Sequence, residues 1–350
     1  MFYLKYRPRT ITELDNSQIR ERMMKLLTSK ELPHALLFVG PKGMGKTSTA
    51  RIFAKAVNCD KNVFAKKGNS FEPCNLCANC NSIDTGSSPD VVEQDAASNR
   101  GIDEVRKLIR ESSFSPMSGR YRVYIIDEAH MITPDAFNAL LKTLEEPPKS
   151  VIFILATTNE EKLPSTIISR CVRFSFGTAR SKDIVSMLKR IAQHENIDIL
   201  DDLMTMIANY SENSFRDATK LLEELAIQDK LSYNSAQEYL GIRSKGKLLE
   251  IMQNGTVSDA IRWIEDFVAS GGNVKRIIED SLNTLRLQLV SKSIGTISES
   301  DLSFSLRELS LLIKLFHEAY SNLKISPIDA LPLELAVVEF YNASKSVKSP

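Results

Sequence analysis

The sequence predicts an α/β domain built on a parallel sheet, followed by two helical domains. Three observations lead to this fold class. Short apolar runs rich in β-branched residues alternate with helical segments over roughly the first half of the chain. One of these runs leads directly into a glycine-rich loop, and the strand-like runs stop after about Gly177. We therefore expect an α/β domain at residues 1–177, a small helical domain at 178–243 and an all-α domain at 244–350.

The expected strands are nearly continuous apolar runs. Strands of a parallel sheet have this character because helices cover both faces of the sheet. Ligands bind such sheets at the carboxyl ends of strands, and polar motif residues follow the first, third and fourth runs. The expected strands are Ala35–Val39, Val91–Gln94, Arg122–Ile126, Val151–Leu155 and Val172–Phe176.

A glycine-rich loop follows the first expected strand, fits the pattern G-x4-G-K-[ST] and is called the phosphate loop below. Its glycines let backbone N–H groups turn toward phosphate oxygens, and the helix expected from Ser48 to Val57 presents its positive end to the same anion. Lys46 can reach the β- and γ-phosphates, and the Thr47 hydroxyl can bind Mg²⁺. We expect ATP with Mg²⁺ to contact Ser48 and every residue of the loop, Gly40-Pro41-Lys42-Gly43-Met44-Gly45-Lys46-Thr47.

Polar residues also follow the third and fourth expected strands. Asp127 would hold Mg²⁺ and its waters, and Glu128 would orient and activate the attacking water. An acidic pair after a strand is by itself commonly a solvated turn, but its place downstream of a phosphate loop favours catalysis. Thr158 ends the next strand and could hydrogen-bond the γ-phosphate or the water, with ordinary strand-end capping as the alternative.

Helical periodicity replaces strand signals after Gly177. Ala218, Leu221, Leu222, Leu225 and Ala226 are spaced for one helix face, and so are five apolar residues between 184 and 192. The polar stretch from 241 to 247 is interpreted as a linker. Helical patterns continue from 248 to about 344, with breaks at 271–272 and around 295 and 327.

Four of the five cysteines lie close together in the sequence, at Cys59, Cys74, Cys77 and Cys80. The two-residue spacings among the last three let their sulfurs converge on one ion, and four cysteines are a common structural zinc set. A closed shell of thiolates predicts a structural role and no catalysis. An iron–sulfur cluster and free thiols are the alternatives, and Cys171 is interpreted as a packed thiol.

The composition limits the partners and the location of the chain. Lys and Arg number 45 against 44 Asp and Glu, so net charge does not indicate nucleic-acid binding, and any DNA contact must use a local patch. No apolar run approaches the ~18 residues that span a bilayer, and the N-terminus lacks the apolar core of a signal peptide. We expect a cytoplasmic protein without a membrane partner.

Several segments resemble one family of ATPases. The segment Phe137 to Pro148 (FNALLKTLEEPP), the run Asp127 to His130 (DEAH) and the motif Ser169-Arg170-Cys171 are similar to those of clamp-loader subunits. With the four cysteines, the chain resembles the gamma/tau family of bacterial DNA polymerase III subunits. The resemblance is dense up to about residue 176 and weak beyond 245. It implies an AAA+ P-loop domain with an inserted zinc module at about 59–80, a helical lid and an all-α collar.

The resemblance also assigns roles to single residues. Arg170 would act in trans, as an arginine finger that reaches ATP on the neighbouring subunit. A surface ion pair is the alternative for that arginine. Arg216 would touch the γ-phosphate of the chain's own ATP, and Thr158 would be a polar sensor. The segment Tyr6-Arg7-Pro8 would line the adenine pocket.

A possible DNA contact precedes a basic helix. Ser98, Asn99, Arg100 and Arg106 resemble the segment with which clamp loaders follow the duplex backbone. Ser98 or Asn99 could cap the helix, and its N-terminal amides could meet a phosphate. The alternative is a solvated basic face.

The family implies a role in replication. The chain would be an ATP-hydrolysing motor in a ring with other clamp-loader subunits, loading the sliding clamp onto primer-template DNA. Alternatives are an ATP-binding scaffold of the same assembly and another AAA+ DNA-processing motor. One departure affects the base pocket: Asn16-Ser17 replaces the Gly-Gln step that the family usually carries.

Overall fold

The computed structural model describes residues 1–29, 31–61, 72–98, 101–240, 247–269, 272–294 and 304–345. It divides into two compact units, Met1–Ser232 and Tyr233–Pro350. The division falls inside the stretch for which the sequence predicts the first helical domain. The α/β part and the helices up to Ser232 therefore belong to one unit.

A parallel sheet forms the centre of the first unit. Among the described residues it has five strands in the order β2-β3-β4-β1-β5. All residues of β4 are buried, as its apolar sequence predicts. The register brings strand ends together at one edge, because Val39 pairs with Thr157 and Asp95 with Asp127. The strands are β1 (Ala35–Val39), β2 (Val91–Asp95), β3 (Arg122–Asp127), β4 (Val151–Thr157) and β5 (Val172–Ser175).

All five expected strands are confirmed, and their bounds differ from the predicted ones by at most two residues. The largest difference is at β4, which continues to Thr157 because Val39 of β1 still pairs there. The parallel sheet predicted from continuous apolar runs is likewise confirmed.

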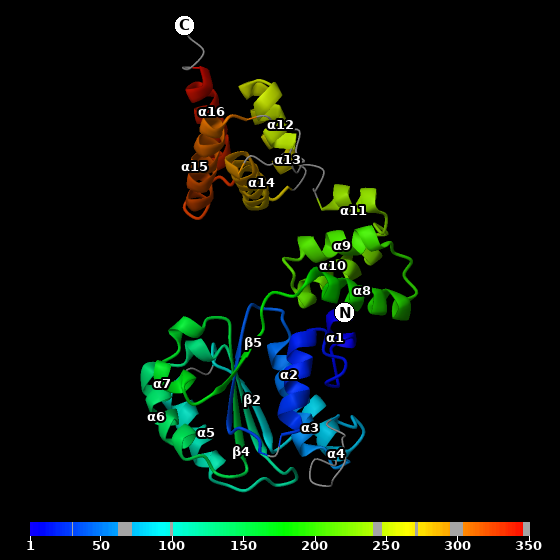
Figure 1. The fold of residues 1–350 in the computed structure, drawn as a ribbon, viewed down its shortest axis with the longest axis vertical. Helices are drawn as coiled ribbons and strands as arrows, with labels where there is room; N and C mark the ends of the chain where they lie inside the picture. Colours follow the sequence, from blue (N-terminus) through cyan, green and yellow to red (C-terminus); the bar gives the residue numbers. More distant parts are fainter. Residues whose placement is uncertain are drawn as a thin grey trace. The chain divides into compact units, whose positions relative to one another are not determined.

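Helices cover both faces of this sheet (Figure 1). One face carries α2 (Ser17–Leu27), α3 (Lys46–Asn58) and α4 (Ala78–Asp84), and the other α5 (Ile102–Ser112), α6 (Pro134–Glu145) and α7 (Ser165–Ile168). Shorter elements are α1 (Phe2–Lys5) and the 3-10 turns η2 (Ala129–Met131) and η3 (Glu160–Lys162).

The face under α5, α6 and α7 is a continuous apolar core. Tyr124 and Phe153 stack on adjacent strands with ring centroids 5.2 Å apart, and Phe137 and Leu140 of α6 are buried against them. Full burial of one such side chain stabilises the fold by about 2–3 kcal/mol. The core therefore fixes the ends of β3 and β4, where the polar motif residues begin.

Three helices complete the first unit: α8 (Ser181–Glu195), α9 (Asp201–Tyr210) and α10 (Phe215–Ile227). The apolar residues between 184 and 192 that were expected to share one face of a helix are buried on α8. The Ser214 hydroxyl accepts a hydrogen bond from the backbone N–H of Asp217 and caps α10. The cap fixes the start of α10 at Phe215, the residue before Arg216.

Every secondary-structure element among the described residues of the second unit is a helix. Its core gathers apolar side chains from α12 to α16, including the fully buried Phe316 and Leu333. Ser305 and Glu308 form a reciprocal capping box at the start of α15. The helices are α11 (Tyr233–Tyr239), α12 (Lys247–Asn254), α13 (Val257–Ala269), α14 (Val274–Ile294), α15 (Leu306–Asn322) and α16 (Leu331–Lys345).

The expected breaks near 271 and 327 agree with the ends of α13 and α15. Gly295 and residues 241–246 of the expected linker lie outside the described residues. None of the helices in the described ranges is long and apolar enough to span a membrane.

Candidate functional site

A cavity of about 400 Å³ lies in the first unit at the edge of the sheet where the strands end. The phosphate loop, the end of β3, the N-terminal segment and helices α8 and α10 all contribute side chains. Residues predicted for nucleotide binding make up much of its lining, namely Tyr6, Arg7, Pro8, Lys42, Gly43, Met44, Gly45, Lys46, Thr47, Ser48, Asp127, Glu128 and Arg216. The structure thus brings most of the predicted site together.

The phosphate loop leads straight into the first turn of α3. Gly43 and Gly45 have φ of 83° and 85°, a left-handed conformation that favours glycine. A Cβ on Gly43 would stand 2.2 Å from Oγ of Ser214, the cap of α10, so the missing side chain also lets the two segments approach. The loop therefore depends on glycine for both its curvature and its packing.

Lys46 lies inside this loop and is buried. Its Nζ donates to the carbonyl oxygens of Gly40, at 2.8 Å, and Pro41, at 2.9 Å. Burial lowers the pKa of Lys46, and the carboxylates of Glu128 and Asp127 oppose that shift. Gly40 and Pro41 contribute these carbonyl oxygens and are not part of the cavity lining.

Thr47 and the two carboxylates meet at the end of β3. The Thr47 hydroxyl donates to Oδ2 of Asp127 at 2.6 Å, and Oδ1 accepts from the Glu128 backbone N–H at 2.9 Å. Glu128 has a left-handed φ of 47°, which is strained for a residue with a side chain. Thr158 donates to Oε2 of Glu128 at 3.1 Å, so it lies beside that carboxylate but outside the cavity lining.

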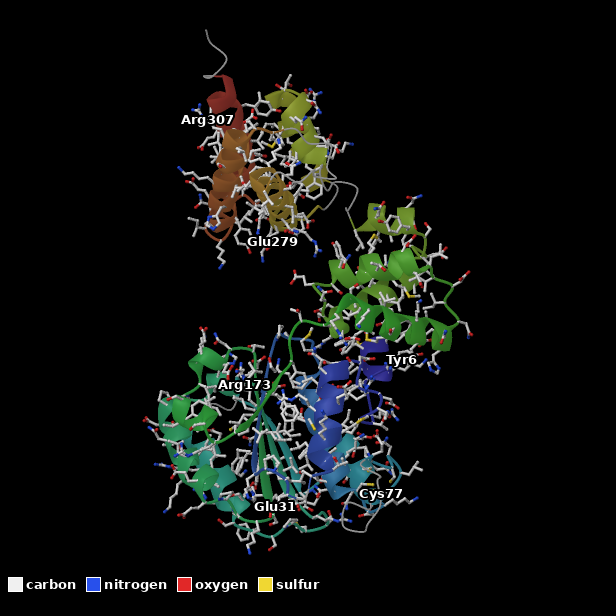
Figure 2. The ribbon with its side chains drawn as sticks, viewed as in Figure 1. Tyr6, Glu31, Cys77, Arg173, Glu279 and Arg307 are labelled. Carbon is white, nitrogen blue, oxygen red and sulfur yellow. The ribbon has the colours of Figure 1, made fainter. Side chains whose placement is uncertain are left out.

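The N-terminal segment reaches the cavity through contacts to α3 and α8. Arg7 donates from Nε to Oγ of Ser48 at 2.8 Å, and burial lowers the pKa of its guanidinium. The Tyr6 hydroxyl donates to Glu195 of α8 at 2.6 Å (Tyr6 is labelled in Figure 2). These contacts hold Tyr6 against α8 and Arg7 against the first turn of α3.

Arg216 extends from the first turn of α10 into the cavity. Its guanidinium carbon lies 4.9 Å from the ring centroid of Tyr3, a cation–π contact. Tyr3 was missed by sequence reasoning, since no local pattern links the N-terminus to a helix more than two hundred residues away. Asp15, Met187 and Thr219 also line the cavity without a sequence signal.

Asn16 and Ser17, where the family resemblance led us to expect a Gly-Gln step, have local roles. Asn16 lines the cavity, and its Oδ1 accepts from the Ile19 backbone N–H at 3.2 Å, which caps α2. Ser17 accepts from the Arg180 guanidinium. Burial raises the pKa of the preceding Asp15 to about 6, although Arg190 lies 2.9 Å away.

Arg170 lies outside the cavity lining. Nη2 is 2.5 Å from Oε1 of Glu145, and Nη1 donates to the Thr166 carbonyl oxygen at 2.7 Å. The side chain is therefore in an ion pair, one of the two interpretations that the sequence allows. It remains 33% exposed at the surface of this unit.

The four predicted cysteines converge. Their sulfur atoms all lie within 4.8 Å of one another, so this four-cysteine cluster could hold one metal ion (Cys77 is labelled in Figure 2). Backbone N–H groups of Cys74, Cys77 and Cys80 point at the sulfurs of Cys59, Cys74 and Cys77, at 3.3 to 3.4 Å. Burial raises the pKa of Cys74, but hydrogen bonds from the backbone N–H groups of residues 76 and 77 and from the Cys59 and Cys77 side chains more than offset it and bring the value to about 7. The donor set fits a thiolate-bound metal.

The four-cysteine cluster is fastened to the elements around the cavity. Lys55 of α3 is 1% exposed, and its Nζ reaches Asn75, at 2.7 Å, and Asp84, at 2.9 Å. The Glu72 carboxylate accepts from the backbone N–H groups of Ile11 and Thr12 at 2.7 and 2.8 Å. Cys171 lies apart, against the core of the other face, and burial raises the pKa of its thiol to about 11.

The predicted helix cap near the DNA-contact segment is wrong for Ser98. Gly101 is the N-cap of α5, without a side-chain bond, and the Ser98 hydroxyl donates to Asp95 at 3.2 Å instead. Asn99 and Arg100 lie outside the described residues. Arg106 is exposed, and its Nη1 lies 3.8 Å from Oδ1 of Asp103, one turn earlier in α5.

A phosphate loop after β1, a carboxylate pair at the end of β3 and a helical segment that lines the same cavity are the arrangement of the P-loop class of α/β proteins. The family model described as "DNA polymerase III, delta subunit" matches residues 15–180. DNA polymerase III subunit gamma of Buchnera aphidicola is 32% identical, over 97% of this chain and 95% of the relative. The chain belongs to the gamma/tau family of DNA polymerase III subunits.

Longer relatives match over part of their length. DNA polymerase III subunit tau of Bacillus subtilis is 37% identical over 98% of this chain, which spans 63% of that relative. The gamma/tau subunit of Mycoplasma genitalium is 33% identical over 98% of this chain, which spans 59% of it. The family resemblance inferred from the sequence motifs is therefore confirmed.

Proposed function

We propose that this chain binds ATP with Mg²⁺ and hydrolyses it as a motor subunit of the assembly that loads the sliding clamp onto primed DNA. The observation that carries the proposal is the hydrogen bond between Thr47 and Asp127 beside Glu128. A hydroxyl from the phosphate loop and a carboxylate from β3 meet there, which is the oxygen pair that a phosphate-bound Mg²⁺ needs.

The residues around the cavity divide the chemistry between them. Lys46 would exchange the carbonyl oxygens of Gly40 and Pro41 for β- and γ-phosphate oxygens, which are stronger partners for an ammonium group. Mg²⁺ held by Thr47 and Asp127 would neutralise developing charge. Glu128 would take the proton of the attacking water.

Two residues would hold the catalytic groups in place. Thr158 already bonds the Glu128 carboxylate and would orient it toward the water. Arg216, which reaches the cavity from α10, would bind the γ-phosphate of the chain's own nucleotide. Tyr6, Arg7 and Pro8 would surround the adenine.

Arg170 would complete the site of a neighbouring subunit. Its place outside the chain's own cavity and its partial exposure support action in trans. A guanidinium supplied in trans stabilises charge in phosphoryl transfer. Partners would be the other clamp-loader subunits, the clamp and primer-template DNA. Ser98 and Arg106 would lie beside the phosphate backbone of that DNA.

The four-cysteine cluster would bind a structural zinc ion. Four thiolates close the tetrahedral shell of zinc and leave no position for a substrate. The observation that supports this is the convergence of the four sulfurs within 4.8 Å. We expect purified protein to contain about one zinc ion per chain, and a zinc content far below that would contradict the proposal.

The decisive experiment measures ATP hydrolysis by the reconstituted assembly, with clamp and primed DNA added separately. We expect both additions to stimulate turnover. Arg170→Ala should leave ATP binding to the isolated chain intact and abolish stimulated hydrolysis. Unchanged turnover on addition of clamp and DNA would favour a scaffold that binds ATP only to assemble, and unchanged turnover in Arg170→Ala would exclude the trans role.

A further inference from the structure

Arg170 follows the short helix α7, and two elements define where its guanidinium points. Nη1 donates to the carbonyl oxygen of Thr166, at 2.7 Å, and to the hydroxyl of Ser169, at 3.4 Å. Nη2 pairs with Oε1 of Glu145 at 2.5 Å. The first two contacts are local, whereas Glu145 belongs to a different helix. Glu145 is therefore the contact that ties the guanidinium to an element outside its own segment.

Glu145 is the last residue of α6, a helix that is capped at its start and buried along one face. Thr133 caps its start, and Phe137, Leu140 and Leu144 anchor it in the apolar core. The helix lies beside α7 on the same face of the sheet (Figure 1). The carboxylate is thus presented by a rigid element, which is what a positioning group requires.

Local stability does not explain a glutamate at this position. The carbonyl end of a helix disfavours negative charge by about 0.3–1 kcal/mol. The pair with Arg170 is half exposed, with 33% and 49% of the two side chains accessible, and an exposed pair contributes at most about 1 kcal/mol. Freezing a long arginine side chain removes up to about 2 kcal/mol of rotamer entropy. The remaining effect of Glu145 is to order the Arg170 side chain before it contacts the neighbouring subunit's nucleotide.

We propose that Glu145 is a positioning residue that holds Arg170 in the orientation required at the neighbouring subunit's nucleotide. The inference rests on the proposed trans role of Arg170. Glu145 touches no nucleotide of its own chain, since it is not part of the cavity lining. It acts through the guanidinium by restricting its rotamers, so its loss should lower turnover without weakening nucleotide binding.

The test compares Glu145→Gln with two matched controls in the reconstituted assembly. Glu146→Gln changes the neighbouring exposed carboxylate. Glu160→Gln breaks another ion pair of the same length, that of Glu160 with Arg173 at 2.5 Å (Arg173 is labelled in Figure 2). We expect Glu145→Gln to lower kcat about fivefold, with KM for ATP and the nucleotide affinity of the isolated chain unchanged. Both controls should retain the wild-type kcat.

A charge reversal sharpens the test. Glu145→Lys places a like charge beside Arg170 and should lower kcat further than Glu145→Gln, toward the value of Arg170→Ala. Wild-type kcat in Glu145→Gln together with an inactive Arg170→Ala would overturn the positioning role and leave the proposed function standing. Full activity of Arg170→Ala would instead overturn the trans finger itself. A parallel fall in nucleotide affinity, or equal losses in the controls, would show a structural role and also overturn the inference.

Discussion

The Thr47 hydroxyl donates a hydrogen bond of 2.6 Å to the Asp127 carboxylate, which joins the first turn of α3 to the end of β3. The two residues come from strand-helix segments that are separated in the sheet by β4. The second oxygen of Asp127 accepts from the Glu128 backbone N–H, so both carboxylate oxygens are oriented. One carboxylate therefore connects the phosphate loop with Glu128, the proposed general base.

Replacement of Asp127 by Asn should separate metal binding from folding. The amide keeps the shape and one acceptor oxygen, but it removes the negative charge that a divalent cation needs. We expect hydrolysis in the assembly to fall by about 10²-fold or more. Nucleotide titrations at several Mg²⁺ concentrations check the cause: the variant should lose the Mg²⁺ dependence of affinity, and a retained dependence would contradict the assignment.

Replacement of Glu128 by Gln should act on chemistry alone. Gln can still accept from the Thr158 hydroxyl, which lies 3.1 Å from Oε2, but it cannot take a proton from water. General-base catalysis contributes about 10²–10⁴-fold, and we expect a loss of kcat in that range with ATP binding retained. Single-turnover hydrolysis and equilibrium binding measured on the same preparation distinguish this result from a binding defect.

The Asp15 carboxyl, on a side chain only 10% exposed, should make stability depend on pH. Burial raises its pKa from the ordinary 3.8 to about 6. Between these values the folded chain holds a proton that the unfolded chain has lost, so the free energy of unfolding falls as pH rises. The contribution is complete below pH 3.8 and is lost as pH rises through about 6.

Asp15→Asn should remove this dependence. At pH 7.5 the variant should be more stable than the wild type by as much as about 2 kcal/mol, because it no longer ionises a buried group. Urea unfolding followed by circular dichroism at pH 4.5 and 7.5 measures the change. Identical slopes against pH in the wild type and the variant would exclude Asp15 as the source.

Local patterns predicted the parts of the site that occupy one continuous segment. The phosphate loop and the Asp127–Glu128 pair each follow a strand whose apolar run is visible in the sequence, and the register of the parallel strands aligns their ends. The cysteine spacing predicted the cluster for the same reason, because three of its ligands lie within seven residues.

Contacts between distant segments could not be predicted in this way. Tyr3 meets Arg216, and Asp15 meets Arg190, only because α1 and the segment just before α2 approach the helices of residues 181–227. The wrong prediction of a cap at Ser98 has a local cause. The Asp95 carboxylate, three residues earlier, accepts the hydrogen bond of the Ser98 hydroxyl, and the helix begins after Gly101. The hydrogen-bonding preference of a single side chain does not reveal which of several neighbours it will bond.

Removal of metal from the four-cysteine cluster should weaken nucleotide binding at a distance. Residues around the cluster contact two segments that adjoin the cavity: Glu72 binds the Ile11 and Thr12 amides, and Asn75 and Asp84 bind Lys55 of α3. If metal removal disorders the four-cysteine cluster, these hydrogen bonds and this ion pair should weaken. The lining residues that follow Thr12 then lose a fixed position.

We expect the metal-stripped chain to bind a fluorescent ATP analogue about fivefold more weakly, equivalent to roughly 1 kcal/mol, the net contribution of one ordinary hydrogen bond. Glu72→Gln, which keeps the cluster but weakens the link to Ile11, should reproduce part of that loss at full metal content. Cys171→Ser is the matched control, since that thiol lies on the other face of the sheet, and it should change neither metal content nor affinity. Full affinity after metal removal would show that the four-cysteine cluster folds its own segment and does not support the nucleotide site.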